Sequence, residues 1–245
     1  MKKILNQSEA IDDYYSRFYL DEHKKYFTKK RTASEVDFLI ELLGKMPDSI
    51  CDVACGNGRH LALFKKLGIN LGLGIDSNKN LLTKASENLN FDPDFKLLNN
   101  TFDLWQPEGK FDIVYTLFSS TCYCLEDQQA QNLVKKMVTA TQKNGIIVID
   151  TENVFPMVGY LDVEYCTYNR VLRFDPEKMT IDSKQDVGDA ILETSRRYYL
   201  ATEISYFLQN TGIKKDQIKI FGDFDKSLYT LSSDRLIIVA RNLAS

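Results

Sequence analysis

The chain has 245 residues, of which 44% are hydrophobic and 27% charged, and its formal net charge is −3. This composition is typical of a globular protein with room for one large α/β domain, and no apolar run approaches the roughly 18 to 20 residues of a membrane-spanning helix. The slightly acidic balance argues against a nucleic-acid partner, because phosphate binding normally requires a basic surface.

The first 15 residues contain two lysines but lack the continuous apolar stretch of a secretion signal. The five cysteines are an odd number and too few to outline a disulfide framework. Both features predict a reduced, cytoplasmic protein without a membrane partner. The sequence does not indicate whether the chain forms an oligomer.

Strand-like and helix-like segments alternate over the first 150 residues. A helix is expected over residues 33–45, where Val36, Leu39, Ile40 and Leu43 recur at helical spacing. The strands expected after it are 49–53, 71–76, 95–98, 111–118 and 145–150, and the helices are 58–68, 78–89 and 126–143, the last stopping at Gly145. This alternation predicts βαβ units and a doubly wound parallel sheet.

The pattern changes from Thr151 to about Thr194. Aromatic and β-branched residues with frequent charges in 164–175, 178–183 and 190–199 predict short antiparallel strands, inserted after the fifth strand. A helix over 199–212 follows, and 218–225 and 234–242 predict a closing strand pair. The simplest account is a single domain, residues 1–245, whose core (31–150 and 195–245) is interrupted by an insertion (151–194).

The stretch CDVACGNGRH, from Cys51 to His60, directly follows a predicted strand. A glycine-rich turn between a strand and a helix brings backbone N–H groups and the helix N-terminus up to a ligand. Glycine is needed where the ligand comes too close for a Cβ atom. Asp76, at the end of the next strand, lies where a carboxylate bonds ribose hydroxyls. These features predict a nucleoside site, and they also fit a dinucleotide dehydrogenase.

Three details favour a different ligand. The dehydrogenase fingerprint has a third glycine, and Leu61 occupies its place here. Nothing else in the sequence is typical of a dinucleotide clamp. Asp52 lies four residues before Gly56, where an anion repels a pyrophosphate but attracts a cation. S-adenosylmethionine carries a sulfonium and an ammonium group and no phosphate, so this turn suits it.

Five segments follow one another along the chain: DVACGNG, GIDSNKNLL, NNTFDLW, KFDIVYTLFSS and KNGIIVIDT. Together they resemble the motifs of the class I S-adenosylmethionine-dependent methyltransferases, and GDFDKSLYTLSSDRLIIVARN resembles that family's last antiparallel strand pair. RTASEVDFLIELL is similar to the small-molecule N-methyltransferases of the glycine and amino-sugar type. The resemblance implies a Rossmann-like sheet of about seven strands, S-adenosylmethionine as cofactor and S-adenosylhomocysteine as product.

The resemblance also implies roles for single residues at the cofactor. Asp52 would bind the methionine ammonium, Asp76 the ribose, and Asn100 the adenine amino group in place of the family's usual aspartate. Other cofactor contacts would come from Ala54, Gly56, Gly58, Ser77, Thr101, Phe102 and Leu117.

Two further contacts are implied near the N-terminus. Arg31 matches the arginine that grips the methionine carboxylate in the glycine-type enzymes, although an arginine before a helix is often a surface residue. Tyr14 or Tyr15 resembles the tyrosine on the segment that closes over the cofactor, so residues 1–30 would form a helical lid. The alternative for these tyrosines is an aromatic face packed on the core.

On the acceptor side, the insertion of residues 151–194 would form a cap over the substrate. The candidate substrate-facing residues are Tyr15, His60, Tyr123, Arg196 and Tyr198. Cys122 and Cys124 lack the further Cys or His cluster of a metal site and the Pro-Cys motif of a cysteine nucleophile, so they are expected to be core or pocket-wall thiols.

The acceptor atom is inferred from what the chemistry requires. A neutral amine needs only prior loss of its proton, whereas an oxygen or carbon acceptor needs a positioned base. Apart from the two histidines and the tyrosines, no base is evident, which favours nitrogen. The sequence therefore predicts in-line methyl transfer to a small-molecule amine. Two alternatives stay open: a methyltransferase of RNA or protein, and a nicotinamide-dependent Rossmann enzyme or nucleotide-binding regulator.

Overall fold

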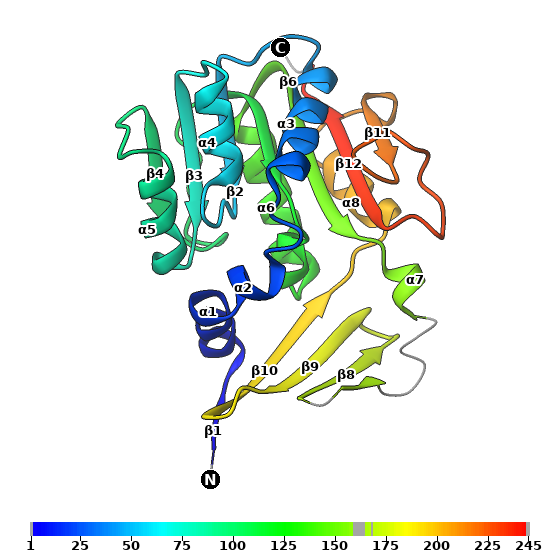
Figure 1. Cartoon of the computed structure of the whole chain (residues 1–245). Helices are drawn as coiled ribbons and strands as arrows, with labels where there is room; N and C mark the ends of the chain where they lie inside the picture. The colour runs from blue at the N-terminus through cyan, green and yellow to red at the C-terminus, as the bar shows by residue number, and fades with distance from the viewer. Residues whose placement is uncertain (1, 159–164, 168, 244–245) are drawn as a thin grey trace.

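The computed structural model describes residues 2–158, 165–167 and 169–243 (Figure 1). Its larger sheet has seven strands in the order β11-β12-β6-β5-β2-β3-β4. Neighbours from β6 to β4 pair in parallel, while β12 pairs antiparallel with both β6 and β11. The strands are β2 (Ser49–Val53), β3 (Leu71–Asp76), β4 (Phe95–Asn99), β5 (Phe111–Thr116), β6 (Thr141–Glu152), β11 (Ile218–Phe221) and β12 (Arg235–Arg241). The predicted Rossmann-like class, with its antiparallel last strand, is confirmed.

Helices cover both faces of this sheet, as expected for buried parallel strands. They are α3 (Lys29–Leu43), α4 (Arg59–Lys66) and α5 (Lys79–Asn88) on one face, and α6 (Asp127–Ala140) and α8 (Ala201–Gln209) on the other. Leu61 of α4 packs against Gly74 of β3, where an added Cβ would lie 2.7 Å from the Leu61 Cδ1 atom. The close helix–strand approach is therefore provided by a glycine on the strand instead of a glycine on the helix.

Two differences between the expected and the observed boundaries have a clear physical cause. Helix α6 ends at Ala140 and β6 begins at Thr141, so Gly145 lies inside the strand instead of stopping a helix. A Cβ at Gly145 would lie 2.8 Å from the Asp112 carbonyl oxygen, so the strands approach too closely there for any side chain. Helix α3 begins earlier than expected, because the Thr28 side chain caps it by accepting a hydrogen bond from the Arg31 amide at 3.2 Å.

The insertion forms a second, five-stranded sheet in the order β1-β10-β9-β8-β7. The predicted antiparallel strands are present, although Glu164 and Tyr168 of one predicted segment lie outside the described residues. The sequence did not predict β1, which pairs in parallel with β10. The strands are β1 (Lys3–Leu5), β7 (Tyr165–Cys166), β8 (Arg170–Asp175), β9 (Thr180–Asp186) and β10 (Ala190–Arg197).

The N-terminal helices α1 (Gln7–Arg17) and α2 (Tyr19–His23) lie between the two sheets (Figure 1). The Gln7 side chain exchanges two hydrogen bonds with the backbone of Ser195 on β10, at 2.9 and 2.7 Å. At the other side of α1, the side-chain amide of Asn78 donates to the Asp12 carboxylate at 2.8 Å and to the Ser16 hydroxyl at 2.9 Å. Helix α1 is thus bonded to both sheets. Short helices α7 (Val154–Val158), η1 (Ser120–Tyr123) and η2 (Lys215–Gln217) complete the chain. Within the described ranges, no helix is long and apolar enough to cross a membrane.

Candidate functional site

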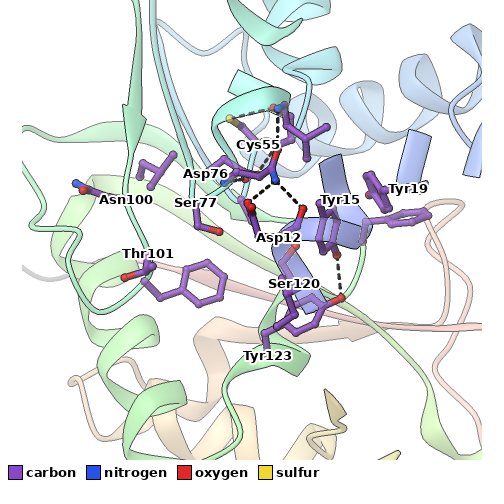
Figure 2. Close-up of a pocket in the computed structure, with 18 of the residues that line it drawn as sticks. Asp12, Tyr15, Tyr19, Cys55, Asp76, Ser77, Asn100, Thr101, Ser120 and Tyr123 are labelled. Atoms are coloured by element: carbon purple, nitrogen blue, oxygen red, sulfur yellow. Dashed lines mark hydrogen bonds between the residues drawn. The ribbon is translucent and has the colours of Figure 1, made fainter. Parts of the chain in front are cut away.

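A cavity of about 700 Å³, here called the larger cavity, opens at the carboxyl ends of β2, β3 and β5. In open parallel sheets this edge is the usual place for a ligand. Figure 2 shows Asp76, the last residue of β3, and the following Ser77 across from Tyr15 and Tyr19 of the N-terminal helices. The sequence-predicted residues that line it are Tyr15, Asp52, Ala54, Gly56, His60, Asp76, Ser77, Asn100, Thr101, Phe102, Leu117 and Tyr123.

The two glycines of the turn after β2 have different functions. Gly56 (φ 55°) lines the cavity, and a Cβ atom there would meet nothing within 4 Å, so the main chain is open to a ligand. Gly58 (φ 69°) is the N-cap of α4, and a Cβ there would lie 2.9 Å from the Cβ of Ala85. Gly58 therefore does not line the larger cavity but lets α4 and α5 approach closely.

Asp52 lies near the carboxyl end of β2, and this buried residue lines the larger cavity. Its Oδ2 accepts a hydrogen bond from the Tyr115 hydroxyl at 3.0 Å and lies 3.8 Å from Nδ1 of His60. Burial raises the pKa of Asp52 to about 7, against the smaller lowering effects of the Tyr115 bond and the Arg59 charge. In the described part of the chain, no lysine or arginine forms an ion pair with this buried carboxylate, so a cation placed beside it would be strongly stabilised.

Asp76 joins the two loops that form the cavity wall. One carboxylate oxygen accepts the Gly56 amide at 2.8 Å, and the other accepts the Asn78 amide at 2.8 Å. Burial raises its pKa as well, while those backbone bonds act in the opposite direction. The Asn100 amide donates to the Asp76 carbonyl at 3.0 Å, which brings the predicted adenine-side residue to the same wall.

The lining of the larger cavity is strongly acidic. Among the described residues, five carboxylates line it, against one guanidinium, that of Arg59. The acidic residues are Asp12, Asp52, Asp76, Asp103 and Glu126. A field of this sign attracts a cationic ligand and opposes one that carries phosphates.

Arg59 was missed in the sequence, although it immediately follows the glycine turn. Its guanidinium donates to Glu35 and, at 2.8 Å, to the Thr32 hydroxyl, and it lies 5.3 Å from the centroid of the Phe27 ring. Glu35 is buried and also accepts from His60 at 2.8 Å and Arg31 at 2.9 Å. Burial alone would raise the pKa of Glu35, but His60 and Arg59 lower it to about 2, so it stays ionised.

His60 and Arg31 are held by that same carboxylate. Burial, with the Arg59 charge second, lowers the pKa of His60 to about 4, so its ring is neutral near pH 7. Arg31 does not line the larger cavity; its guanidinium lies 5.7 Å from the centroid of the Phe118 ring. Of these two predicted residues, the structure brings only His60 to the cavity.

A smaller cavity of about 250 Å³ lies between the N-terminal helices and the insertion sheet. The two cavities share Ile11, Tyr15, Tyr19, Phe118 and Tyr123. The Tyr15 and Tyr123 hydroxyls meet at 3.0 Å on this common wall (Figure 2). Burial raises the pKa of both tyrosines, so both hydroxyls are neutral.

The predicted residues Tyr14 and Arg196 line this smaller cavity instead of the larger one. Tyr14 donates to Glu22 at 3.0 Å. Arg196 lies 3.9 Å from Glu152, which also lines the cavity and was not predicted. Tyr198 is fully buried and lines neither cavity; its hydroxyl donates to Glu152 at 3.2 Å.

The cysteine pair lies close to these residues. Cys122 is buried with its Sγ 3.2 Å from the Thr151 hydroxyl, and the buried Cys124 lines the larger cavity. In the part of the chain that the structure describes, no three His, Cys, Asp or Glu side chains are grouped so that they could hold a metal ion.

The doubly wound sheet with its antiparallel last strand, and the acidic cavity beside its glycine turn, define a class I methyltransferase fold. Residues 50–145 match the family described as Methyltransferase domain, so this part of the chain is a methyltransferase domain. The match runs from β2 into β6 and includes the turn after β2, Asp76 and Tyr123.

One curated relative is the dTDP-3-amino-3,4,6-trideoxy-alpha-D-glucopyranose N,N-dimethyltransferase of Streptomyces venezuelae, which is 30% identical over 139 residues. The match covers 56% of this chain and 55% of the relative, so the chain spans about half the length of the curated relative that it matches.

Several solved structures share the fold over nearly the whole chain. An S-adenosylmethionine-dependent methyltransferase from Clostridium acetobutylicum is similar with a TM-score of 0.70 and 15% identity, covering 91% of this chain and 96% of that one. A sugar N-methyltransferase from Streptoalloteichus has a TM-score of 0.66 and 16% identity, covering 94% of each chain. An S-adenosylmethionine-bound amino pentose methyltransferase from Micromonospora echinaspora has a TM-score of 0.63 and 16% identity, covering 92% of this chain and 97% of that one. At these identities the likeness shows the fold alone.

Proposed function

We propose that the protein transfers a methyl group from S-adenosylmethionine to a small-molecule amine. The observation that carries this proposal is the negative charge of the larger cavity. Its described lining has five carboxylates and one guanidinium, and it includes the glycine turn whose main chain is accessible at Gly56. A dinucleotide would bring its phosphates to that turn, where the acidic lining repels them. The methionine part of S-adenosylmethionine instead offers two cationic groups and one carboxylate, which matches this lining.

The cofactor contacts follow from that match. Asp52 would receive the methionine ammonium, and Asp76 would bond the ribose hydroxyls. Asn100 would contact the adenine. We assign the methionine carboxylate to Arg59, because it is the guanidinium that lines the cavity, while Arg31 supports it through their shared partner Glu35.

The smaller cavity is the proposed acceptor site, and its wall shared with the larger cavity would be the place of transfer. The bound cofactor supplies an electrophilic methyl group on a cationic sulfur. The half-buried Tyr15–Tyr123 pair would orient the acceptor and exclude water. His60 is bonded to Glu35 and is not among the described residues that line the smaller cavity, so it is a poor base for the acceptor, which supports an amine acceptor over an alcohol.

A small acceptor is supported by the size and surroundings of this cavity. Its volume of about 250 Å³ suits one sugar-sized ring, and residues 1–30 and 151–194 would act as its lid and cap. Glu152 can accept a hydrogen bond from a neutral amine and pair with the methylated ammonium product, while Arg170 and Arg196 add positive charge for a polar acceptor. Amino sugars are the first acceptors to test, because the curated relative is an amino-sugar N,N-dimethyltransferase. We place the reaction in the reducing cytoplasm, which the buried thiols of Cys51, Cys55, Cys122 and Cys124 support.

Two measurements test the proposal. Calorimetry should give micromolar or tighter binding of S-adenosylhomocysteine and none of NAD. Labelled methyl transfer should then be measured to amino-sugar nucleotides, to glycine, and to total RNA and protein as macromolecular acceptors. Binding of NAD without S-adenosylhomocysteine would refute the cofactor, and transfer only to RNA or protein would refute the small acceptor.

A further inference from the structure

The turn after β5 that separates the two cavities has an unusual backbone. Phe118 and Ser119 are consecutive residues with φ of 64° and 65°. Residues other than glycine adopt this left-handed backbone conformation only at a cost in free energy. Such conformations persist only where the surroundings hold them, and they concentrate at functional sites. This turn therefore needs an identifiable restraint.

That restraint is a buried ion pair behind the turn. Arg235 of β12 bonds Asp150 of β6 through Nε and Nη2, both at 2.7 Å, and their side chains are only 9% and 2% exposed. The Phe118 amide donates to Oδ2 of Asp150 at 2.7 Å, and the Ser119 amide donates to the Asp150 carbonyl at 3.1 Å. The backbone amides of both left-handed residues are thus bonded to one aspartate.

The same network reaches the smaller cavity through Ser119. The Ser119 hydroxyl accepts hydrogen bonds from Nη2 of Arg235 at 3.2 Å and from the Glu152 amide at 2.8 Å. Ser119 and Glu152 both line the smaller cavity. A shift of the ion pair would consequently move two lining residues at once.

Phe118 is where this network meets the N-terminal segment. Its ring lines both cavities, and its centroid lies 5.3 to 6.4 Å from those of four neighbouring rings. The Arg31 and Arg235 guanidinium carbons lie 5.7 and 5.9 Å from the same centroid. The four rings are those of Tyr19, His23, Tyr26 and Phe27.

We propose that Asp150 and Arg235 are positioning residues of the acceptor site. They hold the left-handed turn so that Phe118 and Ser119 form the wall against which the acceptor meets the transferred methyl group. This inference rests on the proposed function, because it takes the smaller cavity as the acceptor site. It predicts that loosening the pair impairs use of the acceptor far more than cofactor binding.

The test uses three variants and a matched control. Asp150→Asn keeps an oxygen for the Phe118 amide but loses the ion pair, Arg235→Lys keeps the charge but loses the two-point bond, and Ser119→Ala removes only the hydroxyl. The control is Asp112→Asn at the opposite end of β5, where Asp112 is equally buried and accepts the Asp48 and Ser49 amides at 2.7 and 3.1 Å. Melting temperature, S-adenosylhomocysteine affinity, and kcat and KM for the acceptor are measured for each protein.

We expect Asp150→Asn and Arg235→Lys to lower kcat/KM for the acceptor by about tenfold or more, since small misplacements at a transfer site are costly. Ser119→Ala should give a smaller loss, about threefold, and cofactor affinity should change less than about threefold in all three. The melting temperature of the control should fall by about as much as that of the ion-pair variants, while its kcat/KM stays within about twofold of wild type. If the ion-pair variants melt earlier yet keep wild-type kcat/KM, the pair is only structural and the proposal is overturned.

A failure of the proposed function is distinguishable from a failure of this inference. If wild type binds S-adenosylhomocysteine but methylates no amine, the proposed function is refuted. Amide hydrogen exchange of residues 117–123 then tests separately whether Asp150 and Arg235 hold the turn in place. Faster exchange there in Arg235→Lys but not in Asp112→Asn would support it. Unchanged exchange in both would overturn it.

Discussion

If Asp52 receives the methionine ammonium as proposed, its raised pKa makes the affinity for S-adenosylhomocysteine depend on pH in a defined direction. With a pKa of about 7 in the free protein, Asp52 is about one-tenth ionised at pH 6 and about nine-tenths ionised at pH 8. Only the ionised form can pair with the methionine ammonium of the ligand, which would lower the pKa of Asp52 by roughly one to three units in the complex. Affinity for S-adenosylhomocysteine should therefore fall about five- to tenfold from pH 8 to pH 6, with proton release on binding near pH 7.

Isothermal titration calorimetry at pH 6, 7 and 8, in two buffers of different ionisation enthalpy, measures both the affinity and the proton release. The control variant is Asp52→Asn, which retains Asp76 and every titrating group of the ligand. It should bind more weakly at pH 8 and lose most of the pH dependence. Tyr115→Phe removes the hydrogen bond that lowers the pKa of Asp52, so the midpoint of the wild-type dependence should move to higher pH.

An affinity that is equal at pH 6 and pH 8 in wild type would refute this reasoning. So would a pH dependence of the same size in the Asp52→Asn variant, since the titrating group would then lie elsewhere.

Three further predictions concern the packing and hydrogen bonds around the larger cavity. Gly58→Ala forces a Cβ to within 2.9 Å of that of Ala85 at a positive φ, so it should cost about 1–3 kcal/mol of unfolding free energy in a denaturant titration; an unchanged midpoint would contradict the close packing. Arg59→Gln should weaken S-adenosylhomocysteine binding about tenfold or more by loss of a charge-assisted bond, whereas Arg31→Gln should weaken it less than about threefold, and calorimetry with the reverse order would reassign the carboxylate to Arg31. Ser16→Ala removes the hydroxyl that accepts from two asparagines after β3 at 2.9 Å, so ligand dissociation in stopped flow should be about two- to fivefold faster, and an unaltered rate would mean that α1 does not restrain the ligand.

Much of the larger cavity could be predicted because its determinants are local. Asp52 and Asp76 lie at the carboxyl ends of β2 and β3, and Gly56 lies in the turn after β2; parallel strands bring these ends to one edge of the sheet. The spacing along the chain therefore fixes their positions in space. The same applies to the alternation of helices and strands, which depends on short-range periodicity.

The features that were not predicted depend on contacts distant in sequence. Arg31 and Arg59 flank the same buried Glu35, and only the packing of α3 against α4 decides which guanidinium reaches the cavity. The pairing of β1 with β10 joins residues nearly 190 positions apart through three residues, too short a segment for any periodic pattern. The turn at Phe118 has no glycine, so nothing in its composition indicates a left-handed backbone.

Helix α1 has a consequence for how the two cavities can fill. It is bonded to the loop after β3 through Asp12 and Ser16, and to β10 through Gln7, while its neighbour β1 is a strand of the insertion sheet. A displacement of this one helix would uncover both compartments together, whereas neither can be exposed alone by that route. Under the proposed function, the methyl donor and the methyl acceptor would then be enclosed in one step. Release of either product would require displacement of the same helix.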